Sequence, residues 1–125
     1  MSPRSTEFLH AARRRLATAE VIVEEDPSTG LSAAYYAMLY GARAALSERD
    51  VYAKTHRGTW HELRRVFVAT GELDGDLVAA AQRLQPRREQ ADYDAWEAPA
   101  AAANNAIALA HRLLSAIEVL FPADA

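Results

Sequence analysis

The chain has 125 residues, half of them apolar and a quarter charged, which is the size and composition of a single globular domain spanning residues 1–125. It contains no cysteine, so disulfides and thiolate metal sites are excluded, and with no recognisable signal peptide this favours a cytoplasmic location. The net charge of −3 argues against general affinity for nucleic acid, and apolar runs far shorter than the roughly 20 residues of a membrane span predict no membrane association.

Helical periodicity dominates the chain, and five helices are predicted. Apolar residues recur at helical spacing over about Thr6–Glu25 and again over Leu31–Arg49. A third helix follows from an N-cap at Thr55 to about residue 70, and a fourth, capped by Asp76, carries an apolar stripe to about residue 91. The last helix runs from near Pro99 to Phe121. The predicted fold is therefore all-α, an antiparallel up-and-down bundle of four long helices and one shorter helix.

Single residues predict where this bundle is tight or interrupted. Gly41 lies inside the second helix, where glycine costs up to about 1 kcal/mol relative to alanine, so we expect a neighbouring helix to approach it closely. Pro86 lies inside the fourth helical pattern and predicts a kink or an end there. Tyr35, Tyr36 and Tyr40 are expected to be structural as a set, with at least one ring in the core and hydroxyls that reach polar partners, and a base-stacking platform is the alternative. Trp60 is expected to anchor the core.

The spacing of chemically active residues argues against metal and nucleotide-cofactor chemistry. His56 and His61 are five positions apart, whereas two metal ligands on one helix face need a separation of three or four. No Gly-x-Ser-x-Gly motif and no glycine-rich phosphate loop after a strand is present. We therefore predict neither a metal site nor a cofactor.

Two polar segments stand apart from the packing pattern. Thr55-His56-Arg57-Gly58 opens the third helix with free N–H groups, a histidine and an arginine, which suits either an anion site or a simple capped start. In the segment from Arg87 to Asp94, Arg88 and Asp92 are four apart and able to pair along the helix. Arg88 also shares the apolar stripe of the fourth helix, so it is expected to face the bundle or a partner. A structural ion pair and a functional polar seam both remain open.

These segments, with Ala-Tyr-Tyr-Ala-Met at residues 34–38, Lys-Thr-His-Arg-Gly at 54–58 and Arg-x-x-Ala-Asp-Tyr-Asp at 88–94, resemble the HEPN (higher eukaryote and prokaryote nucleotide-binding) domain, in its short prokaryotic group. The resemblance covers nearly the whole chain. It implies a helical bundle that often dimerises and whose gene is commonly paired with that of a minimal nucleotidyltransferase in toxin–antitoxin or defence systems.

The resemblance also implies a candidate site, which comprises His56, Arg57, Arg88, Asp92 and Tyr93. The leading hypothesis is a HEPN protein that binds a nucleotide, RNA or a nucleotidyltransferase partner there. An alternative is a metal-independent endoribonuclease using Arg88 with a displaced His56. A second alternative is a plain helical interaction module.

The ribonuclease hypothesis meets a departure from the family pattern. Many HEPN ribonucleases carry an arginine followed, after four to six residues, by a histidine, but here Asp92 and Tyr93 follow Arg88. Arg4 with His10, and Arg49 with His56, meet the spacing only formally.

Two further expectations concern partners. In related toxins a tyrosine beyond the Arg and His receives adenylate from the partner nucleotidyltransferase, and the resemblance places Tyr93 near that position; a purely structural phenol is the alternative. We also expect a homodimer, because the alanine-rich final helix and the small residues Gly41 and Ala42 offer flat surfaces for close packing.

Overall fold

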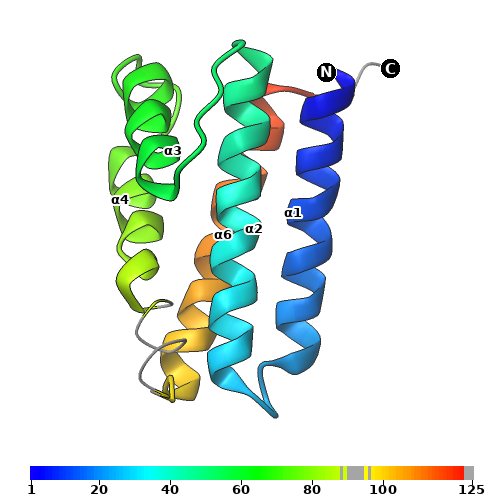
Figure 1. Cartoon of the computed structure of the whole chain (residues 1–125), viewed down its shortest axis with the longest axis vertical. Coiled ribbons are helices and arrows are strands. Elements are labelled where there is room, and N and C mark those ends of the chain that lie inside the picture. The colour runs from blue at the N-terminus through cyan, green and yellow to red at the C-terminus, as the bar shows by residue number, and fades with distance from the viewer. Residues whose placement is uncertain (88, 90–94, 96, 123–125) are drawn as a thin grey trace.

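Helices make up all the regular structure in the part of the chain that the computed structural model describes, residues 1–87, 89, 95 and 97–122. The three long helices are α1 (Pro3–Ile22), α2 (Pro27–Glu48) and α6 (Ala100–Leu120). They pack together, and α2 lies between α1 and the shorter helices of the other side (Figure 1). The predicted all-α helical bundle is confirmed. Within the described residues, no helix is both long and apolar enough to cross a membrane.

The helices begin where the sequence supplies caps. The Ser2 and Asp26 side chains accept hydrogen bonds from the first turns of α1 and α2, each of which also starts on a proline. Thr55 caps the third helix as predicted, by accepting a bond from the Gly58 N–H at 2.9 Å. The predicted cap at Asp76 is two residues late, because Asp74 caps α4 (Gly75–Gln82) and Asp76 lies in its first turn.

The third helix changes its winding along its length. It starts as α3 (His56–Leu63) and continues directly as the π-helical turn η1 (Arg64–Val68). The Ala69 N–H donates to the Arg64 carbonyl at 2.9 Å, which is the five-residue spacing of a π turn. Gly71 follows with a φ of 81°, a left-handed conformation that glycine adopts without strain.

The fourth helix is interrupted at the predicted place. α4 ends at Gln82, which is the residue four positions before Pro86, and residues 84–87 are helical again. Proline has no N–H for the carbonyl of the residue four positions earlier, and its ring clashes with that carbonyl. The break at Gln82 follows from this restriction.

The core is centred on α2. Tyr35, Trp60 and Phe67 are its largest completely buried side chains. A Cβ atom at Gly41 would overlap the Leu114 δ-methyl group of α6, so the predicted close approach of a neighbouring helix is confirmed. Gly41 and Ala42 are thereby buried inside one chain. The surface that we expected these two residues to offer to a second copy is therefore not available, which is a correction to the sequence argument.

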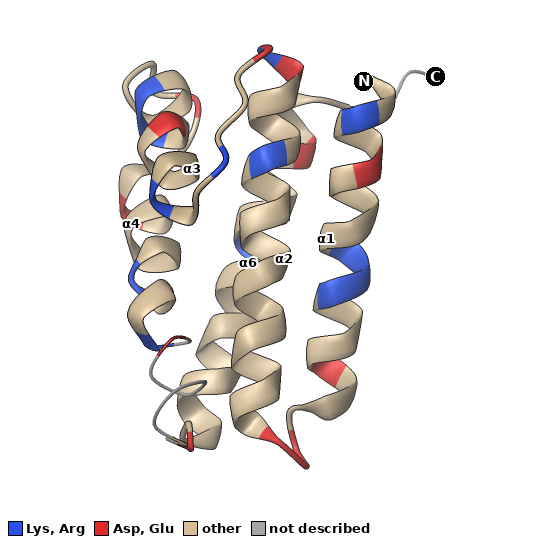
Figure 2. Cartoon of the chain, in the orientation of Figure 1, with Lys and Arg blue, Asp and Glu red and all other residues tan. Residues whose placement is uncertain are grey.

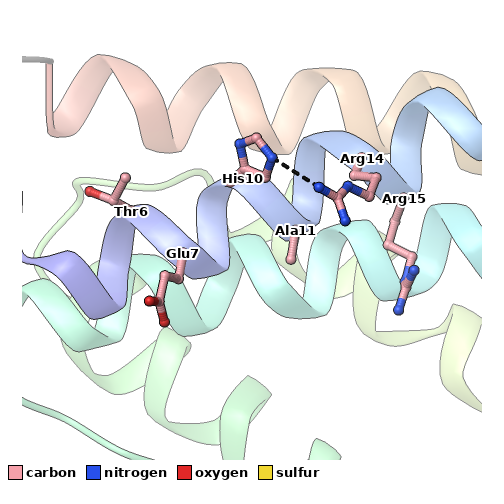
Figure 3. A pocket seen from close by; sticks show the side chains of 6 residues that line it. All are labelled: Thr6, Glu7, His10, Ala11, Arg14 and Arg15. Atoms are coloured by element: carbon pink, nitrogen blue, oxygen red, sulfur yellow. Dashed lines mark hydrogen bonds between the residues drawn. The ribbon is translucent and has the colours of Figure 1, made fainter.

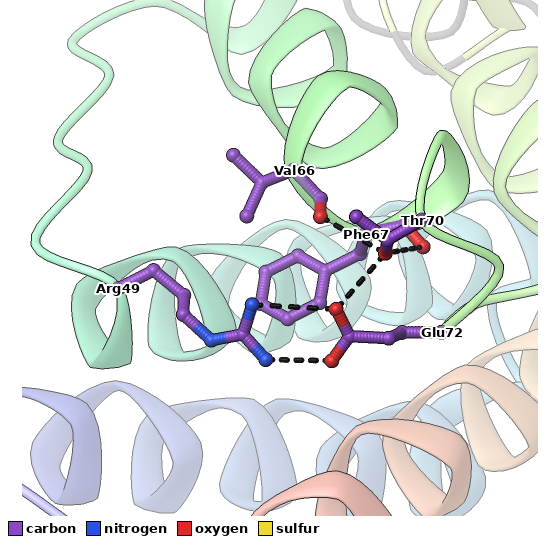
Figure 4. A network of polar contacts seen from close by, with 5 residues as sticks. All are labelled: Arg49, Val66, Phe67, Thr70 and Glu72. Atoms are coloured by element: carbon purple, nitrogen blue, oxygen red, sulfur yellow. Dashed lines mark hydrogen bonds and ion pairs between the residues drawn. The ribbon is translucent and has the colours of Figure 1, made fainter.

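A polar network closes one end of the bundle (Figure 4). Arg49, just after α2, makes a two-pronged ion pair with Glu72 at 2.6 and 3.3 Å, and its guanidinium lies over the Phe67 ring at 4.7 Å. The Thr70 hydroxyl lies within hydrogen-bond distance of three acceptors that share its one proton, namely the Val66 and Phe67 carbonyls near the end of η1 and a Glu72 carboxylate oxygen at 2.9 Å. The hydrogen bonds from Arg49 and Thr70 lower the pKa of Glu72.

Candidate functional site

The clearest constellation of polar side chains surrounds His56, the first residue of α3. Its Nδ1 atom lies 3.1 Å from the hydroxyl oxygen of Tyr35 on α2, and that oxygen accepts a hydrogen bond from the Trp60 indole N–H, also at 3.1 Å. The Tyr35 ring stacks on the imidazole with centroids 5.7 Å apart, and the Tyr36 ring meets it edge-on at 5.8 Å. The half-buried His56 ring is thus held in one orientation by groups on α2 and α3.

The chemistry of the Tyr35 hydroxyl explains why it anchors this ring. An indole N–H only donates, so the tyrosine oxygen must be the acceptor from Trp60, and it keeps the capacity to bond with an imidazole nitrogen as well. Tyr35 and Trp60 are fully buried. A buried hydroxyl with these two partners fixes the orientation of the His56 ring. A histidine that binds a ligand or acts in catalysis requires such support.

The backbone that carries His56 is fixed by its own capping residues. Thr55 caps the helix at the Gly58 N–H, and a Cβ at Gly58 would come within 2.8 Å of the Thr55 hydroxyl oxygen. The buried Thr59 hydroxyl donates to the Thr55 carbonyl at 2.8 Å and accepts from Arg43 of α2 at 3.3 Å. Contacts through Thr59 and through His56 therefore both tie the start of α3 to α2.

Arg57, unlike His56, is not held in place by the described side chains. It is exposed and forms no hydrogen bond or ion pair with any described residue. It lines two adjoining hollows. The larger, about 470 Å³, lies against α3, η1 and α4, and its polar lining consists of Arg57, Arg64, Gln82, Arg83, Gln85 and Glu89. The other, about 450 Å³, lies beside the loop before α3 and includes Tyr52, Lys54 and His61.

Charge is distributed unevenly over the molecule. Figure 2 shows basic positions on α3, on the loop that leads into it and in the segment that follows α4. Although the whole chain carries a net charge of −3, the 470 Å³ hollow is lined by three arginines and one glutamate. The negative net charge argued against nucleic-acid binding, but the surface around this hollow is locally cationic.

Three of the predicted site residues, Arg88, Asp92 and Tyr93, lie outside the described residues. The structure therefore places His56 and Arg57, side by side in the first turn of α3, and leaves the predicted polar seam with the fourth helix as a prediction. Arg64 and Arg83 were not among the predicted site residues. Arg64 had a usable signal, because it stands seven residues after Arg57 and so two turns further along the same helix face.

Neither of the two formal Arg/His pairs forms a site. The Arg4 guanidinium lies over the Phe8 and Tyr52 rings, while His10 contacts Arg14 at 3.3 Å in a hollow on α1 (Figure 3). Arg49, the second formal partner, is engaged by Glu72.

Comparison with known proteins decides the family. The HEPN domain model matches residues 5–120, which is almost the entire helical bundle. The chain belongs to the HEPN family. The resemblance found in the sequence motifs is thus confirmed over the full set of helices.

Two relatives of this HEPN chain come from different domains of life. A protein of Methanocaldococcus jannaschii named "Putative toxin" is 34% identical over 65 residues, which are 52% of this chain and 44% of that protein. A UPF0332 protein of Gloeobacter violaceus is 31% identical over 89 residues, covering 68% of this chain and 71% of the relative. The matched segment thus spans less than half the length of the archaeal relative.

Proposed function

We propose that this HEPN protein is the toxin-like member of a toxin–antitoxin or defence pair and that it binds RNA at the start of α3. The observation that carries the proposal is the imidazole of His56, held by the Tyr35 hydroxyl and two tyrosine rings beside the exposed Arg57. An arginine supplies bidentate phosphate contacts, and a fixed imidazole contacts a base, a ribose hydroxyl or a phosphate. The archaeal relative named as a toxin supports the assignment to such a pair.

The test is direct binding of a labelled single-stranded RNA to the purified chain, followed by fluorescence anisotropy. His56→Ala is expected to lower affinity about tenfold, the loss of one charge-assisted or geometrically fixed contact. His10→Ala on α1 is the matched control, since His10 is exposed and lies away from α3. An equal affinity of wild type and His56→Ala for RNA would contradict the proposed role of this site, and no binding by the wild type would leave the plain interaction module.

A second candidate function, metal-independent RNA cleavage, is favoured by the same fixed histidine. A general acid or base must be held within hydrogen-bond reach of the proton that it moves. Incubating the protein with total and transfer RNA in EDTA checks this candidate, with the His56→Ala, Arg88→Ala double variant alongside. Cleavage by wild type alone supports a ribonuclease, and binding without cleavage supports a binding or regulatory role.

We also propose a minimal nucleotidyltransferase as the protein partner, with Tyr93 as the residue it modifies. This rests on family membership and on the Arg-x-x-Ala-Asp-Tyr-Asp segment at residues 88–94. Co-expression with a nucleotidyltransferase from a neighbouring gene should raise the intact mass by one adenylate, and Tyr93→Phe should abolish the increase. An unchanged mass, or an adduct retained by Tyr93→Phe, would reject the modification.

A further inference from the structure

The 470 Å³ hollow beside α4 is lined by more positive than negative side chains among the described residues. Arg57, Arg64 and Arg83 line it, and Glu89 is the only acidic residue in its lining among the described residues. Like charges brought into one hollow repel each other, so this arrangement is stabilised by an anion. We propose that this hollow binds backbone phosphates of a single-stranded RNA, with Arg64 and Arg83 as the contacting side chains. The inference rests on the proposed function and extends it to a specific surface.

Some arginines of this chain are paired with carboxylates, whereas those that line this hollow are not; Arg14 and Arg112 are also without an ion pair among the described residues, but they do not line it. Arg65, the next residue after Arg64, pairs with Glu62 at 2.6 Å, and Arg13 and Arg49 pair with Glu118 and Glu72. Neither Arg57 nor Arg83 contacts a carboxylate or any other polar group of the described residues. The chain has 17 acidic residues against 14 basic ones, so carboxylates are available, yet they are placed elsewhere.

Arg64 is oriented in a way that suits phosphate binding. Its Nε atom donates to the Gln82 side-chain oxygen of α4 at 3.0 Å, and both of its terminal nitrogens have no partner among the described residues. A guanidinium fixed through Nε keeps the other N–H groups in a rigid fork that matches two phosphate oxygens. The guanidinium of the half-buried Arg64 is thus preorganised for binding an anion.

The lining of the neighbouring hollow favours a strand over a single nucleotide. Arg57 lines both this hollow and the one of about 450 Å³, whose charged lining consists of Arg57, Lys54 and Glu62, and Glu62 is paired with Arg65. Tyr52, 58% exposed, stands beside that second hollow. A cationic groove with an exposed aromatic ring is the arrangement by which proteins bind single-stranded nucleic acid through backbone and base stacking.

The test measures RNA affinity of the full chain against salt concentration for wild type, Arg83→Gln and Arg64→Lys. The probe is a labelled eight-nucleotide single-stranded RNA. Arg83→Gln should lower affinity about tenfold and reduce the slope of log affinity against log salt by about 0.7, the value for one phosphate contact on a single strand. Arg64→Lys keeps the charge but loses the fork, so it should weaken binding with little change in slope. The Arg83 side chain is exposed and makes no polar contact with a described residue, so its replacement should leave the fold intact.

Arg14→Gln on α1 is the matched control, because it removes the same charge from the far side of α2. If Arg83→Gln and Arg64→Lys bind as wild type does while His56→Ala is weakened, the hollow is not the phosphate site and the proposed function stands. If the wild type does not bind RNA, both are rejected. If polyglutamate or ADP binds as tightly as the RNA with the same dependence on Arg83, the hollow takes acidic protein or free nucleotide, and the RNA inference is overturned.

Discussion

At the scale of single residues, Tyr35 links the core to the candidate site. Its ring is fully buried on α2, but its hydroxyl lies between the Trp60 indole and the His56 imidazole. A phenylalanine would fill the same space without either bond. The tyrosine is therefore required for polar geometry and not for packing volume.

Tyr35→Phe is expected to destabilise the protein by about 1–3 kcal/mol, because the buried Trp60 N–H loses its acceptor. Urea unfolding followed by tryptophan fluorescence measures this free energy. Tyr40→Phe is the control, since the half-buried Tyr40 makes ring contacts but its hydroxyl bonds to no described residue. Equal unfolding free energies for Tyr35→Phe and wild type would show that the indole finds another acceptor.

Part of this residue-level picture was predictable from the sequence. The polar segment at Thr55–Gly58 stands out because a pure packing pattern does not place a histidine and an arginine there. Trp60 lies in the core as predicted, and Tyr35 is the tyrosine that supplies the expected buried ring. That the Tyr35 hydroxyl would reach His56 was not predictable, because the contact depends on how α3 packs against α2 and no spacing within one helix encodes it.

At the scale of helices, the contact between α2 and α6 depends on one missing methyl group. A Cβ at Gly41 would overlap the Leu114 side chain. We expect Gly41→Ala to destabilise the protein, because overpacking a core typically costs about 1–3 kcal/mol and the gain in helix propensity is about 1 kcal/mol at most.

The same urea experiment in a Leu114→Ala background tests whether overlap with Leu114 is the reason that Gly41→Ala destabilises the protein. Leu114→Ala alone should cost about 2–5 kcal/mol as a cavity, and adding Gly41→Ala should then be neutral or stabilising because the overlap is gone. Should Gly41→Ala be equally destabilising in both backgrounds, the close approach of Leu114 is not the reason for the glycine.

Glu48 joins the end of α2 to the start of α1. Its carboxylate accepts the Ser2 N–H at 3.0 Å and the Ser5 hydroxyl at 2.9 Å, and the terminal amine lies 3.8 Å away. The Ser2 N–H, more than the other groups, lowers the pKa of Glu48 below its ordinary value of 4.5. A lowered pKa in the folded state means that the stabilisation is complete above that ordinary value and is lost as pH falls through the folded value.

Thermal unfolding of wild type and Glu48→Gln from pH 7 to pH 3 tests this link. The wild type should be the more stable protein at pH 7, and the difference should shrink once the pH falls below about 4.5. Glu72 and Asp26, whose pKa values are also lowered, are present in both proteins and cancel in the comparison. Glu24→Gln, at an exposed position without a polar contact to a described residue, should unfold as wild type does. A constant difference across the whole range would exclude Glu48 as a source of acid sensitivity.

The ends of helices were more predictable than their internal geometry. Thr55 acts as the predicted cap, and Pro86 interrupts the fourth helix through its own ring. Ser2 and Asp26 also cap helices through local side-chain bonds, but these two helices begin at Pro3 and Pro27, earlier than the expected starts at about Thr6 and Leu31. The π turn at Arg64–Val68 had no such local signal, since its residues are compatible with an ordinary α-helix. It arises where Phe67 packs in the core under Arg49, a contact between segments distant in sequence.

At the scale of the whole molecule, we expect a homodimer, as family membership suggests. Gly41 and Ala42 are not available for the interface, whereas Ala100 and Ala101 at the start of α6 are exposed and allow close approach of a second chain. Light scattering at micromolar concentration should give twice the 13.7 kDa of one chain. A measured mass of 13.7 kDa would show a monomer. Ala101→Arg should weaken a dimer that uses this surface. Ala17→Arg, at an exposed position on α1, is the control and should leave the dimer intact.

The π turn of η1 has a consequence for how this chain tolerates changes in length. An α-helix repeats every 3.6 residues, and a turn closed by the Ala69–Arg64 bond holds about one residue more than an ordinary turn. Deletion of one residue between Arg64 and Val68 would convert the wide turn to an α turn. The side chains before and after the turn would keep facing the same neighbours. Elsewhere in α3 the same deletion would rotate Trp60 or Leu63 by about 100° out of the core. Sequences of this fold that differ by one residue should therefore align without a gap up to Leu63 and place the gap in this turn.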